Sequence, residues 1–176
     1  MMPSLRGLTW WLLACLLLSQ VWAQRRREPL TPNEIDLLRD AAQEPEARMK
    51  LFVQFARTRL TSLDTMRADP KATDRAQQTH DLLQDFLDIY DELNDNIDTF
   101  VDRKADLRKP LKLVIEADNE FQAKLRALKQ SVEATPNEVQ TYQFLLGNAL
   151  DAVDAGSQDH RQLLAEQEEA AKHKKK

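Results

Sequence analysis

The chain has little cysteine, glycine and tryptophan, and much of what it has falls within residues 1–23. Its single cysteine, Cys15, all three tryptophans and one of its three glycines lie in that segment. Residues 24–176 therefore contain no cysteine, which excludes from them a disulfide, a cysteine nucleophile and a Cys-x-x-Cys metal site. A fold made from these residues must be stabilised by packing of the chain alone.

Glycine and strand-like patterns are also scarce after the first 23 residues. Only Gly147 and Gly156 occur there, and no stretch alternates polar and apolar residues as a half-buried strand does. The remaining residues are rich in alanine, leucine, glutamate, glutamine, lysine and arginine, which favour helix. The composition predicts an all-α protein with long helices.

An excess of positive charge is missing too. Arg6 is the only charged side chain of residues 1–23, so the net charge is −4 for the whole chain and −5 without that segment. Nucleic-acid binding requires a basic surface, so no nucleic-acid partner is expected. A modest negative charge is typical of a soluble protein.

The first 23 residues have the organisation of a secretory signal peptide. Arg6 precedes a mostly apolar run at residues 8–18, and Val21-Trp22-Ala23 places tolerated side chains at the positions that a signal peptidase reads. We expect cleavage after Ala23 and a mature protein that begins at Gln24. The protein is then secreted or periplasmic, and it contacts a membrane only through the leader.

Two other fates of this segment remain open. Residues 12–15 form an imperfect lipobox, so a lipid on Cys15 is one alternative, although leucines follow the cysteine where lipoproteins turn polar. An uncleaved membrane anchor is the other, because three arginines occupy residues 25–27. As a helix, residues 8–23 measure ~24 Å at ~1.5 Å per residue, short of the ~30 Å hydrocarbon core.

Two Thr-Pro-Asn-Glu boxes, at residues 31–34 and 135–138, each provide a helix start. The threonine caps the helix, the proline fits its first turn, and the glutamate hydrogen-bonds back to the cap. We expect Thr31 and Thr135 to be N-caps. Leu30-Thr31 and Thr135 also resemble the Leu-Thr-x-x-Gln helix starts of periplasmic stress chaperones, with glutamate in place of glutamine.

Helix-breaking positions in the sequence separate five predicted helices. They span residues 32–42, residues 45–67, residue 74 to a point between 103 and 110, residues 111–132, and a last helix from the cap at residue 135, whose continuation past Gly156 remains open. Each long helix has one apolar stripe at helical spacing. The stripes are Met49, Phe52, Val53, Ala56, Leu60 and Leu63; Leu83, Phe86, Tyr90, Leu93, Ile97 and Phe100; Leu111, Val114, Phe121, Leu125, Leu128 and Val132; and Val139, Tyr142, Leu146, Ala149 and Val153.

This pattern predicts an antiparallel bundle of four main helices with a short N-terminal helix beside it. The bundle domain spans residues 31–171. Residues 24–30 and 172–176 are charged and lack periodicity, so we expect a disordered arm and a basic disordered tail there.

The sequence lacks the motifs of common enzyme and cofactor classes. It contains no Glu-x-x-His pair for a di-iron bundle, no Cys-x-x-Cys-His for covalent haem, no His-Glu-x-x-His for zinc, no phosphate loop and no Gly-x-Ser-x-Gly elbow. We therefore expect a protein that is not an enzyme and that has no cofactor or metal.

Residues 93–96 (Leu-Asn-Asp-Asn) and 114–119 (Val-Ile-Glu-Ala-Asp-Asn) are similar to parts of periplasmic cytochrome b562-type bundles. The resemblance implies a four-helix bundle. That family binds haem through a methionine shortly before the first stretch and a histidine near the C-terminus. The region before Leu93, with Phe86, Leu87 and Tyr90, has no methionine, so haem is not expected.

The most unusual feature is a run of acidic residues. Residues 81–102 contain eight acidic side chains and no basic one, and most of them recur at spacings of three and four. Like charges at such spacings destabilise a helix by a few tenths of a kcal/mol per pair, on the order of 0.2–0.5. The candidate acidic interaction stripe is Asp81, Asp85, Asp88, Glu92, Asp95, Asp98 and Asp102.

Two interpretations of the stripe remain open. In the first interpretation, basic side chains of neighbouring helices neutralise the stripe. These are Arg48, Arg57, Arg59, Lys112, Lys124 and Lys129. In the other, it binds a divalent cation or a basic surface of a partner. A calcium loop of the EF-hand type is not expected, because residues 91–102 contain no glycine at the turn position.

Three polar residues, Lys104, Asp118 and His160, interrupt the apolar stripes. If the last two helices turn near Ala134, Asp118 lies level with about Leu150, and His160 lies some ten residues, roughly 15 Å, further along. We therefore expect Asp118 and His160 not to meet and to be partly exposed. Lys104 and His160 are expected to flank the junction after the third helix.

The leading hypothesis for function follows by elimination. It is an exported, non-catalytic helical-bundle protein that binds an unknown protein partner or supports an envelope assembly. The alternative is a periplasmic chaperone-like or divalent-cation-buffering protein that uses the acidic helix face.

Overall fold

A computed structural model describes residues 27–132 and 140–173, which form five helices and no strand. The predicted signal peptide, the capping box at Thr135 and residues 174–176 lie outside the described part. The helices are α2 (Pro32–Asp40), α3 (Pro45–Ala68), α4 (Arg75–Asp102), α5 (Arg108–Val132) and α7 (Gln143–His173). The predicted all-α fold is confirmed. None of the described helices has the length and hydropathy needed to span a membrane.

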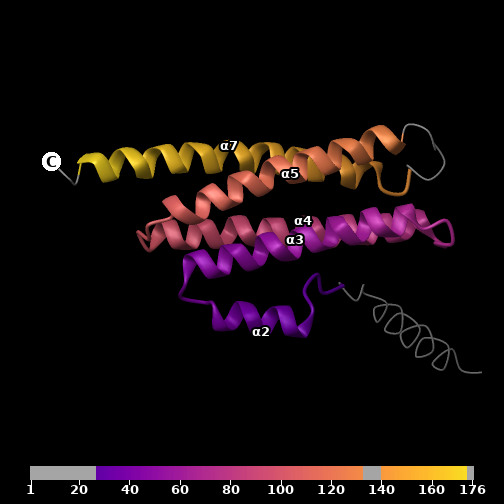
Figure 1. Ribbon diagram of the computed structural model, residues 1–176, viewed down its shortest axis with the longest axis horizontal. Coiled ribbons are helices and arrows are strands. Elements are labelled where there is room, and N and C mark those ends of the chain that lie inside the picture. The colour runs from indigo at the N-terminus through magenta and orange to yellow at the C-terminus, as the bar shows by residue number, and fades with distance from the viewer. Residues whose placement is uncertain (1–26, 133–139, 174–176) are drawn as a thin grey trace, which may run out of the picture.

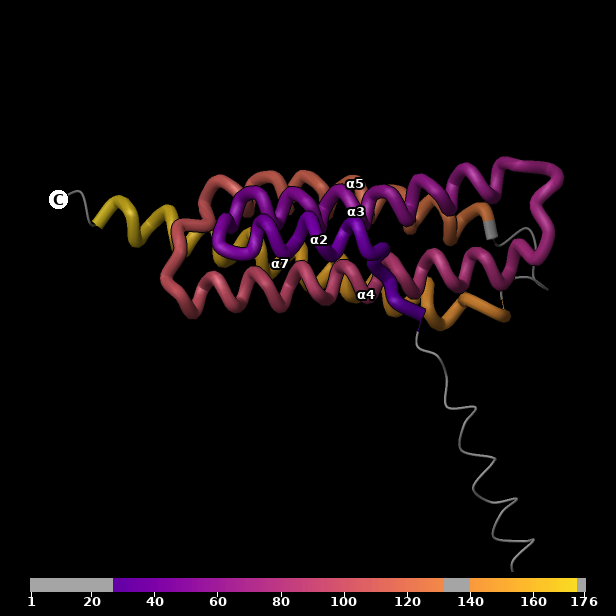
Figure 2. The backbone as a smooth tube through the Cα atoms, turned by 90° about the horizontal axis from the view of Figure 1, so that it is seen from below, coloured from indigo at the N-terminus to yellow at the C-terminus, as the bar shows by residue number. Residues whose placement is uncertain are grey.

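The four long helices form a bundle, and α2 lies against α3 on its outside (Figures 1 and 2). Around the bundle, α3 packs against α4 and α5, and α7 packs against α5 and α4. Consecutive long helices run in opposite directions, so α4 and α7 run in the same direction side by side (Figure 1). The C-terminal end of α7 extends beyond the rest of the bundle (Figure 1).

The predicted apolar stripes form the core. Every member whose side chain the structure describes is buried, including Phe86, Tyr90 and Phe121. The rings of Phe86 and Phe121 meet edge to face, with centroids 5.3 Å apart. Such contacts between rings stabilise a core beyond the burial of their area. Tertiary packing of these stripes therefore holds the helices together.

The helix ends follow local capping rules. At α2, Thr31 Oγ1 accepts a hydrogen bond from Glu34 N at 3.3 Å, and Glu34 Oε2 accepts one from Thr31 N at 2.8 Å. The predicted capping box at Thr31 is therefore confirmed. Pro32 and Pro45 occupy the first turns of α2 and α3, where a missing N–H has no cost.

The turn after α4 is closed by its own backbone. Ala105 N donates to Phe100 O at 3.0 Å, and Lys104 N donates to Val101 O at 2.8 Å. Lys104 has φ 58, the left-handed conformation that such a helix end requires and that glycine adopts more readily. The expectation that Lys104 interrupts an apolar stripe is wrong, because this turn directs it to solvent.

The last helix begins later and ends later than the sequence suggested. Residues 140–142 form a turn, and α7 starts at Gln143. It continues without a break past Gly156 to His173. Lys172 and His173 lie in its last turn, so the tail predicted for residues 172–176 is helical over these two residues, since a chain already in helix continues it at low cost.

Candidate functional site

The acidic residues predicted as one stripe do not share one environment along α4. Asp85 is buried, Asp81 and Asp88 are half-buried, and the four others are exposed: Glu92, Asp95, Asp98 and Asp102. The stripe therefore has an inner part, near the start of α4, that faces the rest of the chain. Its outer part faces solvent.

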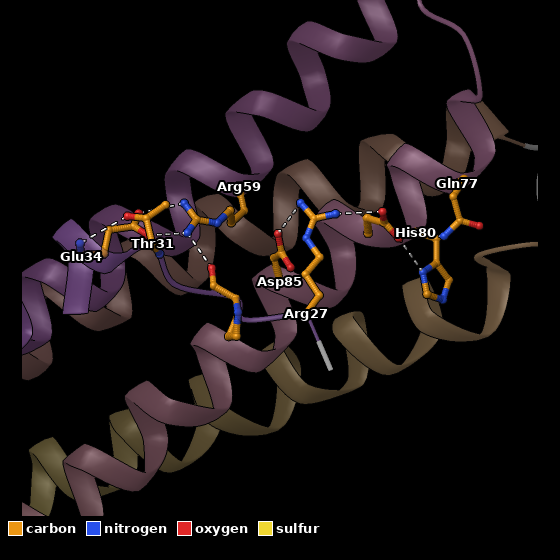
Figure 3. Close-up of polar contacts among 9 residues, drawn as sticks. Arg27, Thr31, Glu34, Arg59, Gln77, His80 and Asp85 are labelled. Carbon is orange, nitrogen blue, oxygen red and sulfur yellow. Dashed lines mark hydrogen bonds and ion pairs between the residues drawn. The ribbon is translucent and has the colours of Figure 1, made fainter. Parts of the chain in front are cut away.

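Arg27 neutralises the inner part of the stripe. Its guanidinium lies 2.8 Å from a carboxylate oxygen of Asp81 and 3.2 Å from one of Asp85 (Figure 3). Burial raises the pKa of Asp85, and the charges of Arg27 and Arg59 lower it only in part. The disordered arm expected for residues 24–30 stays a prediction, and Arg27 within it forms these two ion pairs with α4.

A second ion pair ties the same segment to α3. Arg59 Nη2 lies 2.6 Å from Glu34 Oε2 and donates to the carbonyl oxygen of Pro29 at 2.7 Å (Figure 3). Both charged side chains are nearly buried. Burial raises the pKa of Glu34, but hydrogen bonds from Arg59 and from the Thr31 N–H outweigh it and hold this pKa below its usual value. The arm thus joins α2, α3 and α4.

Of the six basic residues expected to neutralise the stripe, four form ion pairs with other acids. Arg57 pairs with Glu120 at 2.8 Å and Lys112 with Glu168 at 3.0 Å. Arg59 pairs with Glu34, and Lys124 pairs with Asp64. Arg48 donates to Asn96 and to the carbonyl oxygen of Leu38. The stripe forms its ion pairs in the described chain with Arg27, on a segment that carries no helical pattern, while the charges of Arg59 and Arg48 act on Asp85 and Glu92 without an ion pair.

We call the remaining acids of α4 the acidic face: Asp88, Asp91, Glu92, Asp95, Asp98 and Asp102. Within residues 27–132 and 140–173, none of these six side chains forms an ion pair. Partial desolvation and the charges of Asp88, Asp95 and Glu92 raise the pKa of Asp91. The acidic face therefore carries like-charge repulsion without an ion pair in the described chain, and the one favourable charge interaction shown for it joins Glu92 and Arg48.

Two open grooves border the acidic face. One, of about 360 Å³, lies toward α2 and residues 27–30, and its lining includes Arg27, Leu30 and Ile35. The other, of about 460 Å³, lies between α4 and α7. Asp91 lines both grooves.

A buried polar network lies behind the second groove and joins three helices. Tyr90 Oη on α4 donates to Asp118 Oδ1 on α5 at 2.8 Å. His160 Nδ1 on α7 lies 2.9 Å from Asp118 Oδ2, and its Nε2 lies 3.1 Å from Asn94 Oδ1 on α4. Burial and the charge of Asp118 raise the pKa of Tyr90, so its hydroxyl keeps the proton that it donates.

The expectation that Asp118 and His160 stay apart and partly exposed is therefore wrong. Both are buried, with 0% and 3% of their surface exposed. The error came from the assumed turn at Ala134, since α7 begins only at Gln143 and the pairing of residues 118 and 160 centres on residue 139. A shift of the turn by five residues moves the residue level with Asp118 by ten.

The network also includes two residues that the sequence did not single out as polar partners, Tyr90 and Asn94. They lie one turn apart on α4, a spacing that places both on one helix face, and this was the available signal. Gly156 is part of the same arrangement. A Cβ there would lie 2.5 Å from Tyr90 Oη, so the glycine makes room for the hydroxyl.

The network links three helices through side-chain hydrogen bonds. Both ring nitrogens of His160 are engaged by side chains inside the bundle. Among the described residues, no group of three or more His, Cys, Asp or Glu side chains is arranged to hold a metal ion. The surface with unmet interactions is the acidic face.

Comparison with known proteins adds no relative, because no family model, curated protein or solved structure matches the chain.

Proposed function

We propose that this protein is an exported, non-catalytic helical bundle that binds a basic segment of another protein through the acidic face of α4. One observation carries the proposal: six acidic side chains lie on one helix and have no ion-paired cation within the described residues. They stand beside two grooves, which give a partner places to bury apolar groups.

Without a partner, the carboxylates of the acidic face repel one another along α4. Like charges one turn apart destabilise a helix, and at Asp91 partial desolvation together with this repulsion raises the pKa. A basic surface brought against these carboxylates relieves the repulsion in the complex. Complementary charge also speeds association and excludes acidic partners.

Export is the second part of the proposal. Its support is the leader pattern, with Arg6, the apolar residues 8–18 and Val21-Trp22-Ala23. The absence of cysteine from residues 24–176 suits an oxidising compartment, because no thiol is present there to cross-link. The intact mass of the exported protein tests this part: a first residue of Gln24 agrees, whereas a retained leader or a lipid on Cys15 contradicts it.

Photo-crosslinking in the exporting cell tests the binding. A photo-reactive amino acid replaces Asp95 on the acidic face, and in the control it replaces Glu116, an exposed acid on α5 across the bundle. We expect one defined adduct from position 95, whose cross-linked peptide is rich in lysine and arginine and whose yield falls with added salt. Equal yields at both positions, or an adduct without a basic peptide, would contradict the proposal.

A further inference from the structure

The two grooves beside the acidic face differ in what forms their walls. The groove toward α2 has one wall made of residues 27–30, and it already contains the guanidinium of Arg27, which repels a basic partner. Both walls of the other groove are helices, α4 and α7, and no basic side chain lines it apart from the engaged imidazole of His160.

The groove between α4 and α7 combines charge with apolar surface. Asp91 and Asp98 border it on α4, and Asp159 borders it on α7. None of these three carboxylates has an ion pair in the part of the chain that the structure describes. Apolar side chains lie between them: Ile97, Val101, Ala152 and Leu163.

We propose that this groove is the binding site for the basic partner, and that the partner segment is an amphipathic helix of about three turns with basic residues seven positions apart. This inference rests on the proposed function, which it deepens by naming one groove and one kind of segment. It excludes the groove toward α2 as the main contact.

The length of the segment follows from the walls. The lining residues of α4 run from Asp91 to Val101, and those of α7 run from Ala152 to Leu163. At ~1.5 Å per residue these stretches measure ~15 and ~16 Å, which is about three helical turns. A helix laid along them would bury its apolar side in the groove, a common mode of peptide recognition.

The spacing of the basic residues follows from the carboxylates. Asp91 and Asp98 are seven residues apart on α4, so they lie about two turns, ~10.5 Å, from each other. A partner helix parallel to α4 presents side chains at that separation when its own basic residues are seven apart. Asp159 on the facing wall adds a negative charge that attracts the same basic residues from the other side of the groove.

A designed peptide tests the inference with the exported protein. The probe is a fluorescein-labelled 15-residue helix with leucine and alanine on one face and lysines at its fourth and eleventh positions, and a matched peptide carries glutamates instead. Binding is read from fluorescence anisotropy. We expect the lysine peptide to bind and the glutamate peptide not to bind.

Three variants locate the site. Asp98→Asn with Asp159→Asn removes charge from the α4–α7 groove only, and we expect the Kd to rise about tenfold. Ala155→Phe places a ring in the groove at an exposed position and should abolish binding. The control variant, Asp88→Asn with Glu92→Gln, removes equal charge from the part of the acidic face that borders the other groove, and it should raise the Kd by less than threefold because neither carboxylate lines the α4–α7 groove.

The outcomes distinguish the inference from the function that it rests on. If the control variant weakens binding most and Ala155→Phe has no effect, the groove assignment fails and the proposed function stands. If the unaltered protein does not bind the lysine peptide, the groove assignment fails as well, and the photo-crosslinking at Asp95 decides the proposed function separately. Melting curves establish that each variant folds, and Ala155→Leu serves as a smaller block if the phenylalanine lowers stability.

Discussion

Helix α4 carries two polar surfaces that differ in how their groups are satisfied. On its inner side, Tyr90 and Asn94 belong to a buried network in which each polar group meets a partner on another helix. On its outer side, the six carboxylates of the acidic face meet solvent and have no ion pair among the described residues. The first surface joins helices of the same chain, and the second is available to another molecule.

The two surfaces differ in how much they contribute to folding stability, because one is buried and the other is exposed. A buried polar group that loses its partner keeps the full cost of desolvation, so the network is sensitive to every one of its members. An exposed carboxylate stays hydrated, and its removal changes stability by little. Stability measurements should therefore separate the two surfaces clearly.

Removal of Asp118 should have the largest effect. Asp118→Ala leaves the Tyr90 hydroxyl and His160 Nδ1 buried without their shared acceptor, and at ~1–3 kcal/mol for each unsatisfied buried group the two together cost about 2–6 kcal/mol. We expect the free energy of unfolding in urea to fall by that amount. Asp98→Ala, on the acidic face of the same bundle, is the control and should change it by less than ~0.5 kcal/mol. Equal losses would show that the two surfaces do not differ.

The second-largest effect on stability is expected at Gly156, and Gly147 on the same helix provides the contrast. Gly156→Ala forces a methyl group against Tyr90 Oη, and such overpacking costs about 1–3 kcal/mol. Gly147→Ala meets nothing within 4 Å and should instead stabilise the helix by about 0.5–1 kcal/mol. Thermal melts should show a lower melting temperature for Gly156→Ala and a higher one for Gly147→Ala. In a Tyr90→Phe background the cost of Gly156→Ala should shrink, and an unchanged cost would mean that the hydroxyl is not the obstacle.

The elements that sequence predicted well are those with local causes. The stripe from Leu83 to Phe100 recurs at helical spacing, so it predicts both a helix and its buried side. The capping box at Thr31 is likewise complete within four residues. In each case, the residues that form the structure are close in the chain.

The parts that sequence did not predict depend on distant contacts. Arg27 pairs with carboxylates more than fifty residues away, and no pattern in residues 24–30 predicts these contacts. The network pairs His160 with residues of two other helices, so it depends on where the chain turns before α7. A turn position known only to within a few residues is too imprecise to place one side chain opposite another.

Glu34 and Asp85 form ion pairs with Arg59 and Arg27, and their contributions to stability should respond to pH in opposite directions. The pKa of Glu34 is below its usual 4.5 in the fold, so its contribution to stability is present above that pH and is lost as the pH falls through the lowered pKa. The pKa of Asp85 is above its usual 3.8, so its contribution is present at low pH and is lost as the pH rises through the raised pKa.

Two amide variants measure these signs. At pH 7, Glu34→Gln should lower the free energy of unfolding by about 1 kcal/mol, within the range for a lost cap interaction, and the deficit should shrink at pH 3. Asp85→Asn should leave stability equal or higher at pH 7, with no gain at pH 3. Urea midpoints at the two pH values check both. A loss in Asp85→Asn at pH 7 as large as in Glu34→Gln would contradict the assignment of Asp85 as a carboxylate that is costly to charge.

The smallest effect is expected on the acidic face itself. Asp88 is half-buried and accepts a hydrogen bond from Gln84 but forms no ion pair, so Asp88→Asn removes like-charge repulsion and should be neutral or stabilising by a few tenths of a kcal/mol, about 0.2–0.5. If the face binds a protein and not a metal, millimolar calcium or magnesium should leave the melting temperature almost unchanged beyond ordinary screening. A cation that bound the folded state specifically would stabilise it by about 2.7 kcal/mol at a hundredfold excess over its Kd, and Asp88→Asn would reduce that gain. Melts of both proteins with and without the cation therefore discriminate a cation-buffering face from one that binds a basic partner.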